Sequence, residues 1–401
     1  MINLEIPKKL QQVQQMAHQL SATVFRPISR KYDRIEHCDT PEELKPVAQM
    51  MASMRPSRAK AAGKGANDGS SSNGANLTGI VGMEEMCWGD VGLMLSIPGT
   101  GLGNAAIQAV GTAEQKEAFG SLYCAMAITE PGAGSDSAAV STTAVEDGDE
   151  WVLNGTKIYC TAGQRCDAVV VWATLDKSLG KAAIKSFIVP RDNPGMKLLR
   201  VEDKMGLRIS DTAALSLEDC RIPKANILGS AEIANTEAAR KKAFGGVMQT
   251  FDNTRPQVAA MALGVARAAL EITREILEQE GFKGDYARTL YNSSALEAEV
   301  YRMEADLDAA RLMTYKAAWM ADNRQPNSTD ASMCKAKAGR VGNQITLKFV
   351  EICGELGYSE NYLLEKLARD SKIIDIFEGT QQIQQLIVAR NLLGLSSREL
   401  K

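Results

Sequence analysis

The segment Asp375-Ile-Phe-Glu-Gly-Thr-Gln-Gln-Ile-Gln384 places a carboxylate, Glu378, directly before a glycine and a threonine. A threonine ahead of a glutamine-rich and apolar run is typical of a helix start, because its hydroxyl accepts a hydrogen bond from a free backbone N–H group. Taken alone, a glutamate at such a place is more often a capping residue than a catalytic one, since the positive end of a helix stabilises a carboxylate. A functional interpretation therefore needs a second signal elsewhere in the chain.

Two earlier segments supply that signal. Ala127-Ile-Thr-Glu-Pro-Gly-Ala-Gly-Ser-Asp136 offers a hydroxyl and a glycine turn, and Gly155-Thr-Lys-Ile-Tyr-Cys-Thr-Ala-Gly163 follows about 25 residues later. Together with residues 375–384 they resemble the acyl-CoA dehydrogenase family, whose enzymes take a proton and a hydride from adjacent carbons of a CoA thioester. The resemblance runs from about residue 80 to residue 394 and implies an enzyme that uses FAD.

Composition excludes several other classes of protein. The chain has 401 residues, 45% of them hydrophobic, and a formal net charge of −3. It offers no basic field for nucleic acid and no apolar run of the roughly 20 residues that cross a bilayer. Eight scattered cysteines without a Cys-x-x-Cys pair and only two histidines argue against a metal site, a disulfide framework and a histidine-dependent hydrolase. Reduced thiols suit the cytoplasm, or the mitochondrial matrix if a transit peptide has been removed.

The order of patterns along the chain is helices, strands, helices. This order predicts an α+β fold with helical segments at 1–121 and 231–401 and a small β domain at 122–230. The resemblance implies an acyl-CoA dehydrogenase-like architecture, in which these are an N-terminal helical domain, a small β-barrel or sheet domain and a C-terminal four-helix bundle. Within the first domain, residues 55–78 contain too few apolar side chains to pack and are expected to form a mobile loop.

Local patterns refine this outline. Asn154-Gly155 is a hairpin signal inside the run that begins at Trp151. An apolar stripe with helical spacing predicts a buried helix face in the C-terminal domain; its members are Leu296, Val300, Met303 and Leu307. Gly132-x-Gly134 lacks the third glycine of a dinucleotide fingerprint, so a Rossmann fold is disfavoured.

Reduction places negative charge on a flavin ring, which therefore needs hydrogen-bond donors along its edge and a platform against its face. The resemblance implies that Thr129 lies at the pyrimidine edge and that Gly134 and Ser135 lie near the pyrophosphate. It also implies that Tyr159 packs on the ring, where tryptophan is commoner, and that the hydroxyl of Thr161 reaches N5.

A hydrogen next to a thioester carbonyl is weakly acidic, so its base must be desolvated and the enolate oxygen must meet donors. By resemblance Glu378 is that base and its own backbone N–H holds the thioester oxygen. Gly379 permits the close approach of the substrate, and Thr380 and Gln382 match positions near the cofactor. Some family members place the base where this chain has Thr254, which cannot accept the proton, so Glu378 is the sole candidate.

The resemblance also implies the surroundings of the acyl-CoA substrate. Asp252 and Arg255 match residues along the pantetheine channel, and Ser135 serves substrate as well as cofactor. An electron-transferring flavoprotein is the expected acceptor. The length and shape of the acyl chain stay open.

Three residues depart from the family pattern at the edge that serves a neighbouring subunit's FAD. Lys283 stands where an arginine is usual, Glu351 where a glutamine is usual and Glu355 where a glycine is usual. Two added carboxylates would repel a pyrophosphate. The chain is therefore either a homotetramer that has drifted at this edge or part of a heterotetramer with a homologous subunit. A low-activity or non-catalytic subunit and an acyl-CoA oxidase are the alternative functions.

Overall fold

The computed structural model describes residues 6–53, 74–99, 101–233, 237–396 and 399–400. Its N-terminal part is helical, and the long helix α5 packs against α1 and against the C-terminal helices. The helices are α1 (Lys8–Leu20), the π-helical turn η1 (Ser21–Phe25), α2 (Arg26–Arg34), α3 (Leu44–Ser53), α5 (Ala75–Leu95), α6 (Leu102–Val110) and α7 (Ala113–Phe119).

The predicted loop at 55–78 lies mostly at residues 54–73, outside the described part of the chain. Its last residues were assigned wrongly, because α5 already begins at Ala75. The carboxylate of Asp322, far away in sequence, accepts hydrogen bonds from the backbone N–H groups of Asn76 and Leu77 at 2.9 and 3.0 Å. A capping group supplied by a distant helix leaves no local sequence signal.

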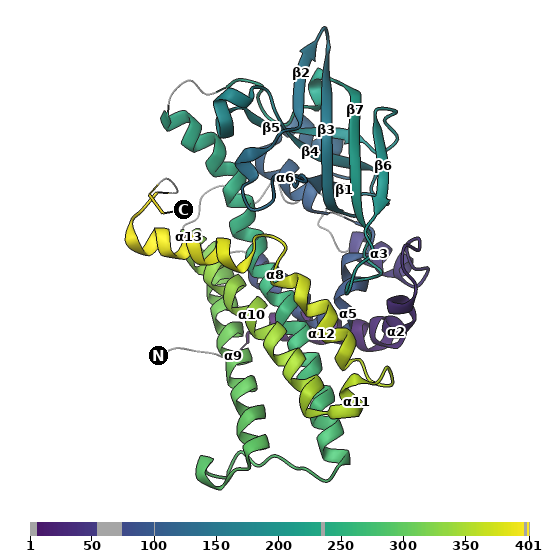
Figure 1. Cartoon of the computed structure of the whole chain (residues 1–401), viewed down its shortest axis with the longest axis vertical. Helices are drawn as coiled ribbons and strands as arrows, with labels where there is room; N and C mark the ends of the chain where they lie inside the picture. The colour runs from purple at the N-terminus through teal and green to yellow at the C-terminus, as the bar shows by residue number, and fades with distance from the viewer. Residues whose placement is uncertain (1–5, 54–73, 100, 234–236, 397–398, 401) are drawn as a thin grey trace.

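A single seven-stranded sheet follows (Figure 1). The strands lie in the order β1-β4-β2-β3-β7-β6, and β5 pairs with β4. Most neighbours are antiparallel, whereas β4 runs parallel to β1 and, at one residue pair, to β2. The strands are β1 (Cys124–Ala127), β2 (Thr143–Asp147), β3 (Glu150–Thr161), β4 (Ala168–Thr174), β5 (Ile184–Pro190), β6 (Met196–Val201) and β7 (Thr212–Pro223).

The hairpin predicted at Asn154-Gly155 is wrong. Strand β3 runs through both residues, and its pairing with β7 shifts register there as in a β-bulge. A Cβ on Gly155 would collide with the side chain of Thr142, so glycine serves a close approach between strands. The turn between β2 and β3 instead lies at Gly148, whose φ is +59°.

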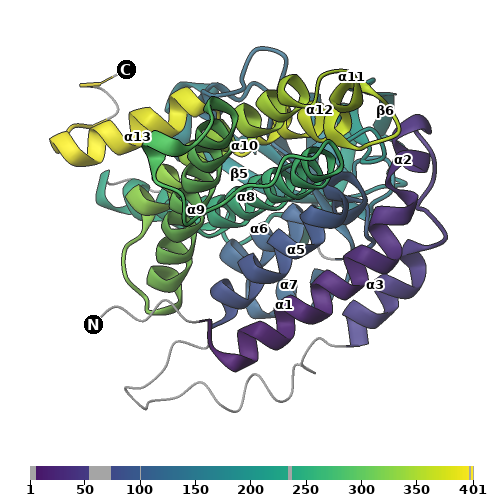
Figure 2. The ribbon, with the colours of Figure 1, turned by 90° about the horizontal axis from the view of Figure 1, so that it is seen from below.

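The C-terminal part is a helical bundle in which α8, α9, α10 and α12 pack against one another (Figure 2). The predicted apolar stripe is confirmed on α9, where Val300 and Leu307 are buried in the main core and Leu296 and Met303 pack against it. The helices are α8 (Glu237–Gln279), α9 (Ala295–Asp322), α10 (Ser328–Ile352), α11 (Gly354–Tyr358), α12 (Leu364–Ile374) and α13 (Gln381–Leu393).

The predicted α+β architecture is confirmed: N-terminal helices, a central curled sheet and a C-terminal helical domain. The proposed boundaries fall between α7 and β1 and between the 3₁₀ turn Lys224–Asn226 and α8. They stay predictions, because element ends alone do not define independently folding units.

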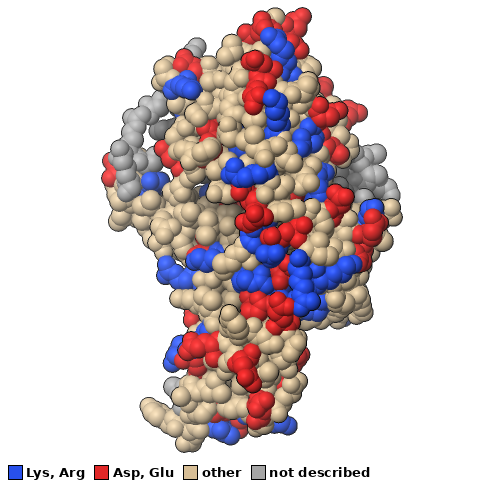
Figure 3. Space-filling model, turned by 45° about the vertical axis from the view of Figure 1, so that its right-hand side comes forward, with Lys and Arg blue, Asp and Glu red and all other residues tan. Residues whose placement is uncertain are grey.

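Charged side chains of both signs are interspersed over the face in Figure 3, in keeping with the small net charge. In the described part of the chain no helix is long and apolar enough to cross a membrane.

Candidate active site

The segment with the proposed base is a tight connection between α12 and α13. Glu378 and Gly379 both have left-handed backbones, with φ of +54° and +100°. A Cβ on Gly379 would collide with the amide of Gln384, so only glycine fits there. Thr380 is the N-cap of α13 and accepts a hydrogen bond from the backbone N–H of Ile383, which confirms the expected helix start.

The carboxylate of Glu378 faces α8. The hydroxyl of Thr254 donates to its Oε2 at 3.0 Å. Burial raises the pKa of Glu378, while the hydrogen bond from Thr254 and the charges of Arg255 and Lys335 lower it. A non-glycine residue in the left-handed region and a desolvated carboxylate are both unfavourable, and their coincidence is typical of functional sites. This environment suits a base that must take a weakly acidic proton.

Two residues that the sequence did not single out hold the backbone of this connection. The ammonium of Lys335 donates to the carbonyl oxygens of Asp375 at 3.1 Å and Gly379 at 2.6 Å. The amide nitrogen of Gln384 donates to those of Glu378 at 3.1 Å and Gly379 at 3.3 Å. The spacing of small residues along α10, with Ala331 and Gly339 one turn to either side of Lys335, is the one signal that marks this lysine as facing inward.

The glycine turn at 131–136 is anchored by Glu130, a third residue whose role the sequence did not indicate. Its carboxylate is buried and accepts hydrogen bonds from the backbone and hydroxyl groups of Ser141 and Thr142 and from Lys157. Burial opposes ionisation, but these bonds prevail and lower the pKa of Glu130 to about 2. The turn therefore rests on a fixed, ionised carboxylate.

The predicted flavin-binding residues lie on and beside this turn. The backbone N–H of Ile158, the residue before Tyr159, donates to the carbonyl of Thr129 at 2.9 Å and so joins the two motifs. Gly134 and Ser135 are exposed, and no atom lies within 4 Å of where a Cβ on Gly134 would be. Thr161 is half-buried at the end of β3.

Tyr159 is 62% exposed and has a φ of +57°. A left-handed backbone that turns a large aromatic ring outward is unfavourable unless the ring serves a purpose. An open aromatic face beside an open glycine turn fits a planar, phosphate-bearing group such as FAD.

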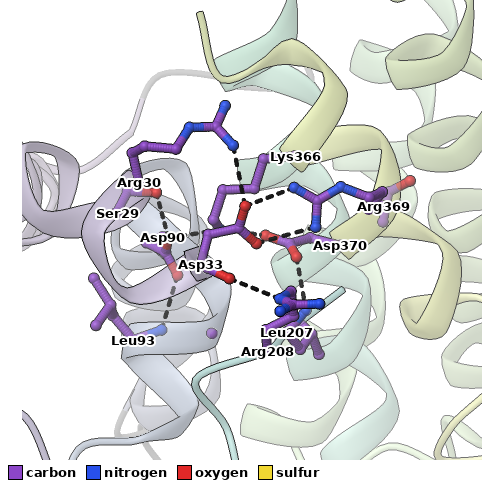
Figure 4. Close-up of polar contacts among 12 residues, drawn as sticks. Ser29, Arg30, Asp33, Asp90, Leu93, Leu207, Arg208, Lys366, Arg369 and Asp370 are labelled. Carbon is purple, nitrogen blue, oxygen red and sulfur yellow. Dashed lines mark hydrogen bonds and ion pairs between the residues drawn. The ribbon is translucent and has the colours of Figure 1, made fainter. Parts of the chain in front are cut away.

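The loop between β6 and β7 connects the strand that carries the predicted flavin-binding residues with the helix that leads to the proposed base. Asp211 accepts backbone hydrogen bonds from Ala162 and Gln164, directly after Thr161. Further back in the same loop, the backbone N–H of Leu207 donates to Asp370 on α12 at 2.7 Å (Figure 4). Helix α12 leads to Glu378 within two turns.

The remaining predicted residues are not all brought together. Arg255 is only 4% exposed and pairs with Asp252 at 2.6 Å. Gln382 is exposed on α13, whereas its neighbours Gln381 and Gln384 face the protein.

The three residues that differ from the family pattern are all exposed. Lys283 follows α8, Glu351 ends α10 beside Lys348 at 2.9 Å, and Glu355 lies in α11. None of the three lies in the glycine turn at 131–136 or in the connection at 375–380.

Comparison with known proteins identifies the family of the chain. The family description "Acyl-CoA dehydrogenase, middle domain" matches residues 125–220, and "Acyl-CoA dehydrogenase, C-terminal domain" matches residues 244–393. The chain is 34% identical over 401 residues to the short-chain specific acyl-CoA dehydrogenase of Bos taurus mitochondria, which covers 98% of this chain and 92% of the relative.

Two further similarities concern a solved structure and an enzyme complex. The butyryl-CoA dehydrogenase of Megasphaera elsdenii is similar with a TM-score of 0.83 at 31% identity, covering 98% of this chain and 100% of the other. The caffeyl-CoA reductase–Etf complex subunit CarC of Acetobacterium woodii is 34% identical over 330 residues, covering 80% of this chain and 84% of the relative. The chain belongs to the acyl-CoA dehydrogenase family.

Proposed function

We propose that this chain oxidises an acyl-CoA thioester to its trans-2-enoyl-CoA, with Glu378 as the base. The observation that carries the proposal is the partly desolvated carboxylate of Glu378, held by Thr254 on a left-handed connection directly before α13. Thr254 occupies the alternative base position of the family and here serves as a hydrogen-bond donor instead. Membership of the family supports the class of reaction, and the buried position of Glu378 supports its proposed role as the base.

The residues of the chain divide the task. Glu378 takes the proton from the carbon next to the thioester carbonyl, and its backbone N–H is offered to the thioester oxygen. Gly379 leaves room for the thioester to approach. Bound FAD would supply the hydride acceptor for the neighbouring carbon. Tyr159 would be a platform for its ring, Thr129 and Thr161 would offer hydrogen bonds to its edge, and the turn with Gly134 and Ser135 would hold the phosphates.

Short, straight acyl chains are the proposed substrate class. The support is that the Bos taurus relative is named as short-chain specific and the Megasphaera elsdenii structure is of a butyryl-CoA dehydrogenase. The similarity to a subunit of a caffeyl-CoA reductase–Etf complex supports an electron-transferring flavoprotein as redox partner. It also favours a second candidate activity, reduction of an enoyl-CoA by the same residues in reverse.

A heterotetramer with a homologous subunit is the proposed assembly. Its support is the charge at the partner edge, where Glu351 and Glu355 add two exposed carboxylates and Lys283 offers a point charge in place of an arginine fork. A homologous partner that has the family's arginine, glutamine and glycine at these positions would contribute them to the FAD site of this chain. This chain, with Lys283, Glu351 and Glu355, would not contribute to an FAD site in the partner.

The test is the purified chain, alone and co-expressed with a homologous subunit. FAD per chain is measured from the visible spectrum, and butyryl-CoA, longer, branched and aromatic acyl-CoAs are then added without oxygen. The proposal predicts bleaching by the short chains and slow reoxidation when air is admitted. Rapid reoxidation by oxygen would identify an oxidase, and a protein that holds FAD but is bleached by no acyl-CoA would refute the dehydrogenase function.

A further inference from the structure

Lys335 is buried inside the bundle beside the base. It is 1% exposed and lies on α10, far from Glu378 in sequence. Gly339, one helical turn further along, faces the same connection, and a Cβ there would lie only 3.0 Å from the carboxylate of Asp375 and 3.1 Å from its Cα. The small residue lets the α12–α13 connection approach α10 closely enough for the lysine to reach it.

The ammonium binds the backbone on both sides of the base. Its two acceptors are the carbonyl oxygens of Asp375 and Gly379, at 3.1 and 2.6 Å. These residues bracket the left-handed position at Glu378, so two bonds from one group fix the strained part of the turn. Gln384 binds the same turn from α13, but with a neutral amide.

The charge of Lys335 acts on the same carboxylate. Burial lowers the pKa of Lys335 to about 8, although Asp375 and Glu378 raise it and Arg255 lowers it further. In return, Lys335 and Arg255 lower the pKa of Glu378 against the effect of burial. Arg255 is already paired with the carboxylate of Asp252, whereas Lys335 donates to two carbonyl oxygens that carry no net charge.

We propose that Lys335 is a positioning residue for the base: its ammonium fixes the backbone on either side of Glu378, and its charge keeps that carboxylate ionised and ready to accept a proton. The proposal rests on the proposed function for the meaning of that proton. A purely structural lysine would hold the turn but would leave the protonation of Glu378 unchanged.

Three variants separate charge from hydrogen bonding. Lys335→Gln removes the charge and keeps a donor, Gln384→Leu removes neutral donors to the same turn and keeps the charge, and Lys337→Gln is the matched control on the exposed side of α10, where the lysine pairs with Asp306. The first readout is the pH dependence of the rate of flavin bleaching by butyryl-CoA in a single turnover.

Lys335→Gln is expected to move the midpoint of this pH profile upward by about one unit, because an opposite charge nearby lowers the pKa of a carboxylate by 1–3 units. Gln384→Leu is expected to lower the rate at every pH without moving the midpoint, and Lys337→Gln to change neither. An unchanged midpoint in Lys335→Gln would overturn the proposal.

A second readout does not depend on catalysis. The difference in unfolding free energy between the parent and its Glu378→Gln variant changes with pH only between the ordinary pKa of glutamate and its pKa in the folded chain. With Lys335→Gln as the parent, this window should extend about one unit higher. If acyl-CoA bleaches the flavin of none of the proteins but this pH range still extends upward, the proposed function fails and the effect of Lys335 on Glu378 stands. If the pH range does not change, the effect of Lys335 on Glu378 is refuted.

Discussion

The carboxylate of Asp370 accepts a 2.7 Å hydrogen bond from the backbone N–H of Leu207. This bond ties α12, which leads to Glu378, to the loop whose far end anchors the turn after Thr161 through Asp211. Leu207 itself has a φ of +50°. The segment with the proposed base and the strand with the proposed flavin-binding residues are therefore connected by buried polar contacts as well as by apolar packing.

Lys366 is the cation of this link, and its removal should destabilise the whole chain. It pairs with Asp370 at 2.5 Å and with Asp90 at 2.7 Å (Figure 4), and burial opposes its charge while the two carboxylates raise its pKa. Lys366→Met leaves two buried carboxylates without a cation, which costs about 3–5 kcal/mol. Urea unfolding at pH 7 measures the loss.

The control for this variant is Lys372→Met on the exposed side of α12, which should change the unfolding free energy by less than about 1 kcal/mol. In Lys366→Met the loss of unfolding free energy should grow as the pH rises above the ordinary pKa of aspartate. In the unfolded chain the two aspartates then ionise freely, whereas in the folded chain they must either ionise without a cation or stay protonated. Equal stability of the two variants would show that the link is dispensable.

Thr254→Val should raise the pKa of Glu378 and leave the fold intact. Valine has nearly the same shape as threonine but cannot donate the 3.0 Å hydrogen bond to the carboxylate. Losing a bond to the charged form is expected to move the pH midpoint of flavin reduction upward by roughly half to one unit. Thr254→Ser, which keeps the hydroxyl, should retain the parent midpoint; a shift in the serine variant alone would contradict this explanation.

Lys335 should make stability rise with pH in the alkaline range. Its pKa is about 8 in the folded chain against an ordinary value of 10.5. Between these values the folded chain has released the proton that the unfolded chain still binds, so the unfolding free energy increases with pH. Relative to Lys335→Met, the parent should gain about 3 kcal/mol across this window. Urea unfolding at a series of pH values measures this gain. If the unfolding free energies of the two proteins changed with pH in parallel, the lowered pKa of Lys335 would be refuted.

The carboxylates at the partner edge should control FAD content. Replacing Glu351 by Gln and Glu355 by Gly removes two negative charges that face a pyrophosphate in the proposed assembly. The double variant purified alone should retain more FAD per chain than the parent, and adding Lys283→Arg should increase it again. Full FAD occupancy in the unmodified chain would argue for a self-sufficient homotetramer.

Local motifs predicted the secondary structure of the proposed site where its residues are contiguous in sequence. The helix start at Thr380 and the strand that carries Tyr159 and Thr161 occur as expected. The functions proposed for the residues in these segments came from the family resemblance and not from periodicity. Both kinds of inference work because the residues that define the turns are neighbours along the chain.

Interactions between distant segments were beyond prediction. The small residues Ala331 and Gly339 indicate that Lys335 faces inward, but only the fold shows that α10 packs against residues 375–379. Asn154-Gly155 satisfies a local hairpin rule, yet the packing of β3 against Thr142 makes it a bulge. The backbone N–H groups at the start of α5 bond to Asp322, which lies at the end of α9 and far away in sequence.

The most direct measurement is the rate of anaerobic flavin bleaching by butyryl-CoA in the parent and in Glu378→Gln, each with FAD bound. Glutamine keeps the size of the side chain but accepts no proton at neutral pH. We predict that the variant binds FAD and butyryl-CoA as the parent does and reduces the flavin at least about a thousandfold more slowly. Bleaching at a rate near that of the parent would contradict the assignment of Glu378 as the base.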